Sequence, residues 1–365
     1  MREFRDKKVI HSLLGEVKKK AVSLPSPVRI MEVCGTHTMA IHKFGLKKLM
    51  REAGVEMVSG PGCPVCITPN EIHESALNLV TQRENFILAT FGDMTRVPTL
   101  NGSLQTAVPA PGSKVQVVYS PQKAVDLAKE HPHKDVVFFG AGFETTIPGI
   151  ALTIKEAQTS ELTNYSILTA FWLIPPAMKA LVEDKDLRIH GFIYPGHVSA
   201  IIGEKPYHFI AQKYQIPGTI AGFEPSDILL AVSSILDQIR EEQAAVDNQY
   251  TRVVKPSGNP QAQQIMDELL VPKDAHWRGL GIIPQSGLKI KTEYSSYDAE
   301  LKYEFPMQTE SEDLPGCRCG DVLRGNIDPT QCPLFSKQCH PRSPYGPCMV
   351  SVEGACFAYY KYRTQ

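Results

Sequence analysis

The sequence predicts an α/β protein with two similar parallel-sheet α/β domains and a small cysteine-rich segment. Apolar runs of strand length alternate with helical stretches from residue 28 to about residue 242. This rhythm is typical of mainly parallel sheets covered on both faces. The strand candidates are numerous enough to favour two such domains over one, and 365 residues suit two or three domains. Six of the nine cysteines fall between residues 317 and 356.

Composition places the chain among ordinary globular proteins. It is 42% hydrophobic, and its 38 basic and 39 acidic residues give a formal net charge of −1. This balance gives no whole-chain attraction to nucleic acid or to membranes, so neither is expected as a partner. Residues 1–20 lack the apolar core of a signal peptide, and the longest apolar run, residues 228–236, is too short to span a bilayer. A cytoplasmic protein is expected.

One helix and a series of strands are predicted along the first half of the chain. Apolar residues recur every fourth position from Val9 to Ala21, which predicts an amphipathic helix over residues 5–22. A βα rhythm follows, with helical stretches after several strands. Strands are expected at residues 28–33, 55–59, 85–90, 115–119, 135–139, 165–170, 189–194 and 219–223.

The last third of the chain is less regular. Ser226 is expected to cap a helix over residues 227–242, and residues 243–280 are interpreted as a polar connection, helical or irregular. The loop-rich tail from residue 310 has too little apolar periodicity to fold without a metal or a disulfide. The predicted domains are residues 28–138, with Cys34 and a C-x-x-C pair, residues 139–280, and a cysteine-rich domain made of residues 1–27 and 281–365.

Cys34 and His37 follow the first predicted strand, where parallel-sheet proteins bind ligands. The next helix is expected to begin near Thr38, so the positive end of its dipole should favour the thiolate form of Cys34. A thiolate is a soft ligand for iron and a good nucleophile. The alternative is a small buried cysteine beside a turn histidine. The surrounding Cys-Gly-Thr-His-Thr sequence favours the functional interpretation.

Cys63 and Cys66 form a Cys-Pro-Val-Cys pair after the second predicted strand. Two intervening residues let the sulfurs pair with each other or share a metal. The alternative is half of a zinc site, completed by Cys34 and His37 or by a partner. Redox exchange or transient metal contact is preferred to structural zinc, because the turn is expected to be too exposed and too short to need a structural metal.

Polar residues after later strands are candidates for the same cleft. Gly140-Ala141-Gly142 begins like a dinucleotide fingerprint, but Thr145 stands at the place of the third glycine, so NAD binding is not expected. No Walker A sequence is present, which argues against nucleotide hydrolysis. Glu144, His197 and Glu224 either face the cleft or serve as caps and satisfied core groups, which is the commoner case.

The six C-terminal cysteines give the strongest signal. Their spacing is too irregular for a zinc ribbon and does not match the bacterial ferredoxin pattern. A cubane iron–sulfur cluster needs four thiolates, which leaves two cysteines able to form a disulfide beside it. A structural zinc site with two idle thiols stays open on spacing alone. The six are Cys317, Cys319, Cys332, Cys339, Cys348 and Cys356.

Short motifs are spread in order along almost the whole chain. They are MEVCGTHT at 31–38, GPGCPVC at 60–66, GFETT at 142–146, PGH at 195–197, GFEPSD at 222–227, PGCRCG at 315–320, YGPC at 345–348 and EGAC at 353–356. Their set and order resemble the HypD family of hydrogenase maturation factors.

The resemblance implies a scaffold for assembling the Fe(CN)2CO unit of [NiFe] hydrogenases. It implies work with the small chaperone HypC and with HypE, which supplies cyanide made with HypF. It also implies two similar α/β domains and a third, iron–sulfur domain. By motif, the ligands of its [4Fe–4S] cluster would be Cys317, Cys332, Cys339 and Cys356.

The same resemblance assigns roles to the remaining cysteines. Cys319 and Cys348 would be a redox pair next to the cluster, and the Cys63–Cys66 pair would be a second step of the same series. Cys34 would be the thiol that holds the iron with HypC, with His37 nearby. The resulting hypothesis is that electrons pass through the two pairs toward iron at Cys34.

Two other functions account for part of the pattern. An iron–sulfur-dependent thiol–disulfide reductase explains the cysteines but leaves the turn from Cys34 to His37 unexplained. A binding module held together by structural zinc, with no redox role, accounts only for the cysteine-rich tail. A conventional small-molecule enzyme ranks lower, since neither an acid–base pair nor a nucleotide-binding loop stands out. Whether the chain is itself an enzyme is left open.

Overall fold

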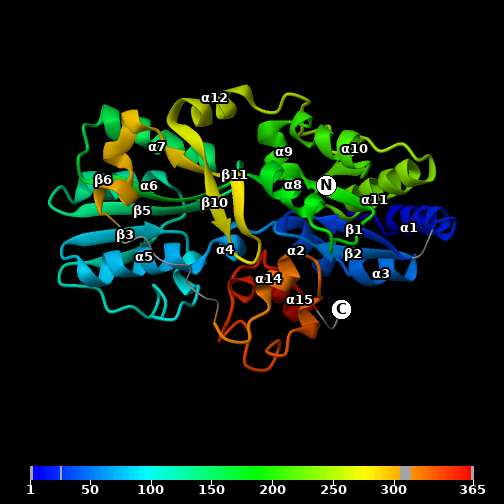
Figure 1. Ribbon diagram of the computed structural model, residues 1–365, viewed down its shortest axis with the longest axis horizontal. Helices are drawn as coiled ribbons and strands as arrows, with labels where there is room; N and C mark the ends of the chain where they lie inside the picture. Colours follow the sequence, from blue (N-terminus) through cyan, green and yellow to red (C-terminus); the bar gives the residue numbers. More distant parts are fainter. Residues whose placement is uncertain (1–2, 25–26, 305–313, 363–365) are drawn as a thin grey trace.

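A computed structural model describes residues 3–24, 27–304 and 314–362. Figure 1 shows two sheets side by side, with the C-terminal tail beneath their junction. The predicted α/β class with parallel sheets is confirmed. Parts of the predicted third domain, residues 305–313 and 363–365, lie outside the described residues.

Within the described residues, the first sheet contains β1 (Val28–Glu32), β2 (Val55–Ser59), β7 (Gly191–Pro195), β8 (Gly218–Ala221) and β9 (Val246–Asn248). All pairings are parallel, in the order β2-β1-β7-β8-β9. Successive side chains point to opposite faces, so Ile30 and Met31 enter different apolar clusters. Both faces of the central strands are therefore covered, which explains their continuous apolar sequences.

The second sheet combines a parallel core with an antiparallel hairpin. Its order is β10-β11-β6-β5-β3-β4, and only the pairings of β11 with β10 and β6 are antiparallel. Residues 243–280, which were interpreted as a polar connection, contain two strands: β9 in the first sheet and β10 in the second. The strands of the second sheet are β3 (Phe86–Thr90), β4 (Lys114–Val117), β5 (Asp135–Gly142), β6 (Tyr165–Trp172), β10 (Leu270–Trp277) and β11 (Gly281–Ile290).

The sheets do not follow the predicted domain boundaries. Each sheet takes strands from two separate stretches of chain, because the chain crosses between the sheets three times. The expected boundary at residues 138 and 139 falls inside β5, and β11 belongs to the second sheet rather than to the cysteine-rich tail. Hydrophobic periodicity identifies strands, but it does not specify which strand edges meet in space.

Helices cover the sheets and form the tail. On the first sheet these are α1 (Lys7–Val22), α2 (Gly35–Lys43), α3 (Leu46–Glu52), α9 (Gly196–Ile202), α10 (His208–Tyr214) and α11 (Pro225–Arg240), with α4 (Pro64–Ile67) after β2. Helix α8 (Ile174–Glu183) connects β6 to β7 and contacts both β11 of the second sheet and α10. On the second are α5 (Asn70–Gln82), α6 (Gln122–Glu130), α7 (Ile147–Thr159), α12 (Pro260–Leu269) and α13 (Ala299–Lys302). The tail holds α14 (Cys319–Leu323) and α15 (Ala355–Tyr362). Short 3-10 turns are η1 (Glu3–Arg5), η2 (Met94–Arg96), η3 (Lys205–Tyr207), η4 (Thr292–Tyr297), η5 (Pro329–Gln331) and η6 (Pro347–Met349).

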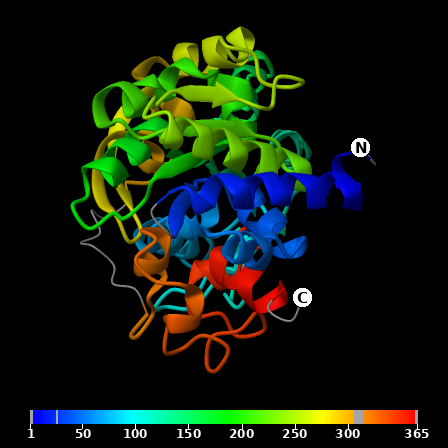
Figure 2. The same ribbon diagram turned by 90° about the vertical axis from the view of Figure 1, so that its right-hand side faces the viewer.

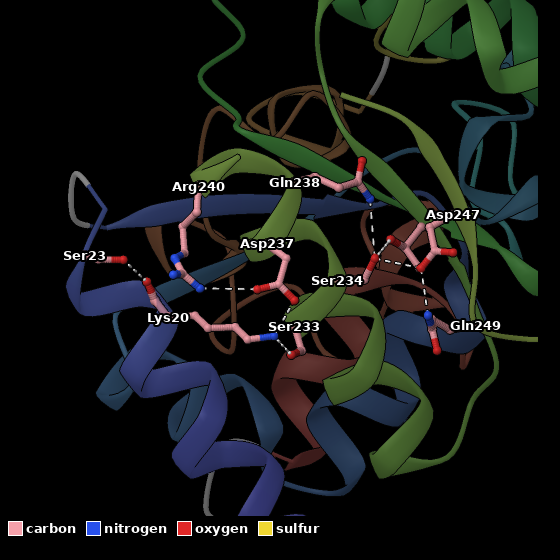
Figure 3. Close-up of polar contacts among 10 residues, drawn as sticks. Lys20, Ser23, Ser233, Ser234, Asp237, Gln238, Arg240, Asp247 and Gln249 are labelled. Atoms are coloured by element: carbon pink, nitrogen blue, oxygen red, sulfur yellow. Dashed lines mark hydrogen bonds and ion pairs between the residues drawn. The ribbon is translucent and has the colours of Figure 1, made fainter. Parts of the chain in front are cut away.

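The N-terminal helix packs on the first sheet and not on the cysteine-rich tail. Figure 2 shows α1 lying along α11, and Val17 and Ala21 enter the same apolar cluster as α11. The Lys20 ammonium donates to Ser233 Oγ at 2.7 Å and pairs with Asp237 (Figure 3). Residues 1–27 were predicted to join the cysteine-rich domain, and that assignment is wrong for α1 because its apolar stripe fits α11.

Helix α11 ties this face of the sheet together. It begins two residues before the predicted start, with Glu224 rather than Ser226 as its N-cap and with Asp227 completing a capping box. Further along, Ser234 donates to Asp247 beside β9 at 2.7 Å (Figure 3). The helix thereby links α1 on one side to the edge strand on the other.

Two neighbouring leucines of α11 provide a test of this packing. Leu229 is 0% exposed in the apolar cluster under α1, whereas Leu230 is 37% exposed. We expect Leu229→Ala to lower the free energy of unfolding by about 2–5 kcal/mol, because it removes buried methyl groups and leaves a cavity. Leu230→Ala should cost less than about 1 kcal/mol. Denaturant titration followed by circular dichroism measures both, and equal losses would contradict the assigned packing.

Candidate functional site

Cys34 lies where the strand order of the first sheet reverses. Strand β2 lies on one side of β1, whereas β7, β8 and β9 lie on the other. At such a point the connections leave in opposite directions and open a crevice that commonly holds ligands. Cys34 follows β1 as the N-cap of α2, while Gly62 follows β2 and His197 follows β7.

A pocket of about 190 Å³ opens beside Cys34. The first sheet contributes Cys34, Gly62 and His197 to its walls. The second sheet contributes residues 145–146, which follow β5, and the tail contributes Glu353. Three parts of the chain that are far apart in sequence must therefore come together to form the pocket.

Burial decides the protonation of the Cys34 thiol. Burial raises its pKa to about 12, and the carboxyl groups of Glu353 and Glu32 act in the same direction. Backbone N–H groups of His37 and Thr36 at the start of α2 oppose the shift in pKa but do not reverse it. The prediction that the helix dipole would favour a thiolate is wrong for this thiol, because desolvation outweighs the helix terminus. A soft cation that binds the sulfur would have to displace its proton.

His37 is buried in the first turn of α2 and carries no charge. Its Nε2 lies 2.9 Å from the carbonyl oxygen of Gly222, to which it donates, and burial lowers its pKa to about 4. Its Nδ1 has no hydrogen-bond partner among the described residues, which leaves a lone pair available. The Phe223 ring lies between the rings of His37 and His197, with centroids 4.7 and 4.1 Å away.

Two carboxyl groups beside Cys34 were not singled out from the sequence. Glu32 accepts the Cys34 N–H at 3.0 Å and the Thr38 hydroxyl, and burial raises its pKa to about 8. Glu353 accepts from the Thr36 hydroxyl at 2.6 Å and lines the pocket. Both residues lie inside the motifs around Cys34 and the last cysteine, which was the only signal available for them.

Cys63 and Cys66 form a disulfide that lies directly against the Cys34 turn. Cys63 is the N-cap of α4, and the two Cα atoms are 5.2 Å apart. Gly35 donates its N–H to the carbonyl of Gly62 at 2.8 Å. A Cβ atom on Gly62 would lie 2.2 Å from the backbone nitrogen of Cys34, so only glycine permits this approach.

Five of the six C-terminal cysteines gather in the tail. The thiols of Cys319 and Cys356 hydrogen-bond to Cys348 and lower its pKa to about 6. The sulfurs of Cys317 and Cys319 lie on the same side of Gly346, where a Cβ atom would approach them to 2.7 and 2.5 Å. Cys339 is the fifth member, and its sulfur accepts the Tyr345 N–H at 3.4 Å. The tail thus concentrates thiols in a small volume.

The tail also meets the Cys63–Cys66 disulfide. The sulfur of Cys66 lies 3.9 Å from the carbonyl oxygen of Pro347, the residue before Cys348. Both cysteines are fully buried in one apolar cluster. The segments that carry these cysteines therefore adjoin one another, from the tail, through the loop with the disulfide, to the Cys34 turn.

The sixth cysteine stands apart from these contacts. Cys332 follows η5 and is half-buried, and the sulfur contacts described above involve the other five. Cys356 contacts the Cys319 and Cys348 pair directly, so the structure does not separate that pair from the predicted cluster ligands. In the described part of the chain, no group of three or more His, Cys, Asp or Glu residues has the arrangement of a metal site.

Glu144 and Glu224 have structural partners. Glu144 is buried and accepts the Ile174 N–H at the start of α8 at 3.0 Å, and burial raises its pKa to about 8. Glu224 caps α11 and pairs with Arg5. Of the three polar residues predicted either to face the cleft or to act as caps, His197 lines the pocket.

None of the helices in the described ranges has the length and apolarity needed to cross a bilayer.

Comparisons with known proteins point to one family. A family model described as HypD, Hydrogenase formation hypA family, matches residues 8–363. The hydrogenase maturation factor HypD of Escherichia coli (strain K12) is 43% identical over 368 residues, covering 100% of this chain and 98% of the relative. The HypD protein of Rhodobacter capsulatus is 42% identical, covering 99% and 97%. The hydrogenase expression/formation protein HupD of Azotobacter chroococcum mcd 1 is 40% identical, covering 100% and 96%.

These matches extend over almost the whole chain and confirm the resemblance inferred from the ordered motifs. The chain therefore belongs to the HypD family of hydrogenase maturation factors.

Proposed function

We propose that this chain is the scaffold on which the Fe(CN)2CO unit of [NiFe] hydrogenases is assembled, with Cys34 holding the iron. The observation that carries the proposal is the pocket beside Cys34, built at the strand-order reversal and lined by Glu353 from the tail. Iron, cyanide and carbon monoxide are cargo here. A thiolate is an electron-rich donor that suits iron carrying these ligands.

The partners follow from the same proposal. The small chaperone HypC would share the iron with Cys34, and HypE would supply cyanide made with HypF. Membership of a hydrogenase maturation family supports partners within the maturation machinery. Assembly would take place in the cytoplasm, without nucleic acid or membrane.

We propose that the tail holds a [4Fe–4S] cluster. The gathering of thiols around Gly346 and the Tyr345 N–H donated to a cysteine sulfur support such a group, since thiolates are its usual ligands, although the cysteines in the described ranges do not, as they stand, have the arrangement of a metal site. When bound, the cluster would supply single electrons next to the Cys319 and Cys348 pair. The proposed ligands are Cys317, Cys332, Cys339 and Cys356.

The remaining thiols would exchange disulfides in two balanced steps. The Cys348 thiolate attacks the sulfur of Cys66, the Cys63–Cys66 bond breaks, and Cys63 leaves as a thiolate that takes up a proton. Cys319 then attacks Cys348 and releases Cys66. The net result is an oxidised Cys319–Cys348 pair and a reduced Cys63–Cys66 pair, a transfer of two electrons. The approach of Cys66 to the residue before Cys348 supports this route.

Reduction of the Cys63–Cys66 pair would place a dithiol beside the iron site. Gly62 touches the backbone of Cys34, so the pair lies next to the proposed iron ligand. Re-forming the disulfide releases two electrons and two protons there, and the iron unit would accept the electrons. A thiol–disulfide reductase would use the same pairs but would leave the pocket at Cys34 without a role.

The first test replaces the proposed iron ligand. We expect Cys34→Ala to remove the infrared bands of iron-bound cyanide and carbon monoxide from the protein copurified anaerobically with HypC, because no soft donor remains in the pocket. Val108→Ala, at a side chain that is 83% exposed, serves as the control and should keep the bands. Unchanged bands in the Cys34 variant would show that another group holds the iron.

The second test separates the cluster ligands from the redox pair. We expect Cys332→Ser to lose most of the bound iron and labile sulfide, because one of four ligands is removed. Cys319→Ser should retain both. Metal and sulfide analysis of anaerobically purified protein measures the difference. Full iron and sulfide in the Cys332 variant would exclude Cys332 from the cluster, and zinc without sulfide in the unmodified protein would exclude the cluster itself.

A further inference from the structure

The turn between β10 and β11 projects from the second sheet into the junction between α4 and α14 (Figure 1). This turn consists of residues 278–280 and is called the hairpin tip below. It lies between the one-turn helix that carries Cys66 and the short helix that begins at Cys319. The proposed exchange depends on these two helices staying together.

One side of the hairpin tip binds the chain just after Cys66. The Arg278 N–H donates to the carbonyl of Ile67 at 2.9 Å, which is the last residue of α4. The Arg278 guanidinium, 3% exposed, donates to Asn70 Oδ1 at 2.5 Å. The tip is therefore attached to both ends of the short link between α4 and α5.

The other side of the hairpin tip packs on α14. A Cβ atom on Gly279 would lie 2.3 Å from the Cα atom of Gly320, the residue next to Cys319. The Arg324 guanidinium donates to the carbonyl of Gly279 at 2.5 Å. The two backbones thus touch where neither carries a side chain, and an arginine from α14's end holds them together.

Trp277, the last residue of β10 and the one just before the hairpin tip, is fully buried in the apolar core. Both tryptophans of the chain are buried there, with ring centroids 5.6 Å apart, and Trp277 also packs on Phe143 beside the pocket. Trp172 donates its Nε1–H to the Thr68 hydroxyl at 3.2 Å, one residue beyond α4. Buried aromatic contacts and this hydrogen bond therefore anchor the hairpin tip beside α4.

We propose that the hairpin tip is a positioning element that holds Cys66 in reach of Cys348 for thiol–disulfide exchange. This role rests on the exchange proposed above. The added claim is that residues 278–280 keep the two reacting cysteines close together. Holding two reactive groups in one geometry raises their effective concentration. The hairpin tip would raise the effective concentration of the two thiols, and none of its contacts described above is to a sulfur of the exchange.

The experiment traps the exchange intermediate in the full-length protein. The double variant Cys63→Ser/Cys319→Ser leaves Cys66 and Cys348 without their resolving partners. In a glutathione redox buffer under nitrogen, their thiols reduce glutathione disulfide to two glutathiones and form the Cys66–Cys348 disulfide. Acid quenching, alkylation and peptide mass spectrometry give the ratio of disulfide to dithiol, and hence the effective concentration of the two thiols.

Two glycines of the hairpin provide a matched comparison. Gly279 and Gly281 have φ angles of +79° and +77°, so alanine strains the backbone equally at both. Only the Gly279 Cβ meets α14, whereas nothing lies within 4 Å of a Cβ on Gly281. In the double-variant background, we expect Gly279→Ala to lower the effective concentration by about tenfold or more, and Gly281→Ala to leave it unchanged.

The possible outcomes are distinct. An unchanged value for Gly279→Ala, or equal losses in both alanine variants, would overturn the inference. If Gly279→Ala does not fold, Arg324→Gln replaces it, and a loss or no change there has the same meaning. If Cys66 and Cys348 form no disulfide even with the hairpin unmodified, the proposed exchange fails, and that result is separate from the role of the hairpin tip.

Discussion

The arrangement of this molecule depends on the close approach of the Gly62 backbone to the backbone of Cys34. The contact brings the loop after β2 against the loop after β1, although side chains would normally keep two such loops apart. It places the Cys63–Cys66 disulfide beside the pocket. The same feature recurs where Gly279 meets Gly320 and where Gly346 faces two sulfurs. At each of these points, a missing side chain lets a cysteine-bearing segment approach its neighbour.

Desolvation sets the chemical state of the site. It raises the pKa of Cys34 and of Glu32 and lowers that of His37, so the groups around the pocket are neutral or nearly so at neutral pH. A soft metal ion that bound the Cys34 sulfur would have to displace its proton.

The site depends on the whole chain because the chain alternates between the two sheets. Because the chain crosses between the sheets, loops from both meet at Cys34, and the tail contributes Glu353. Cys66 and Cys348, about 280 positions apart in sequence, lie in one apolar cluster, where the Cys66 sulfur contacts the carbonyl oxygen of Pro347, the residue before Cys348. A shift of either sheet or of the tail would change the pocket and the contacts between these segments together.

The sequence by itself determined the α/β class, the strands that precede Cys34 and Cys63, and the family, because periodicity and motifs are local properties of the chain. Glu32 and Glu353 were within those motifs, but their contact with the Cys34 turn depends on folding. Only the tertiary structure decided which strands pair, where α1 packs, and that burial keeps Cys34 protonated. These outcomes follow from contacts between distant segments and from the exclusion of water. Both depend on the folded chain and cannot be inferred from a single stretch of sequence.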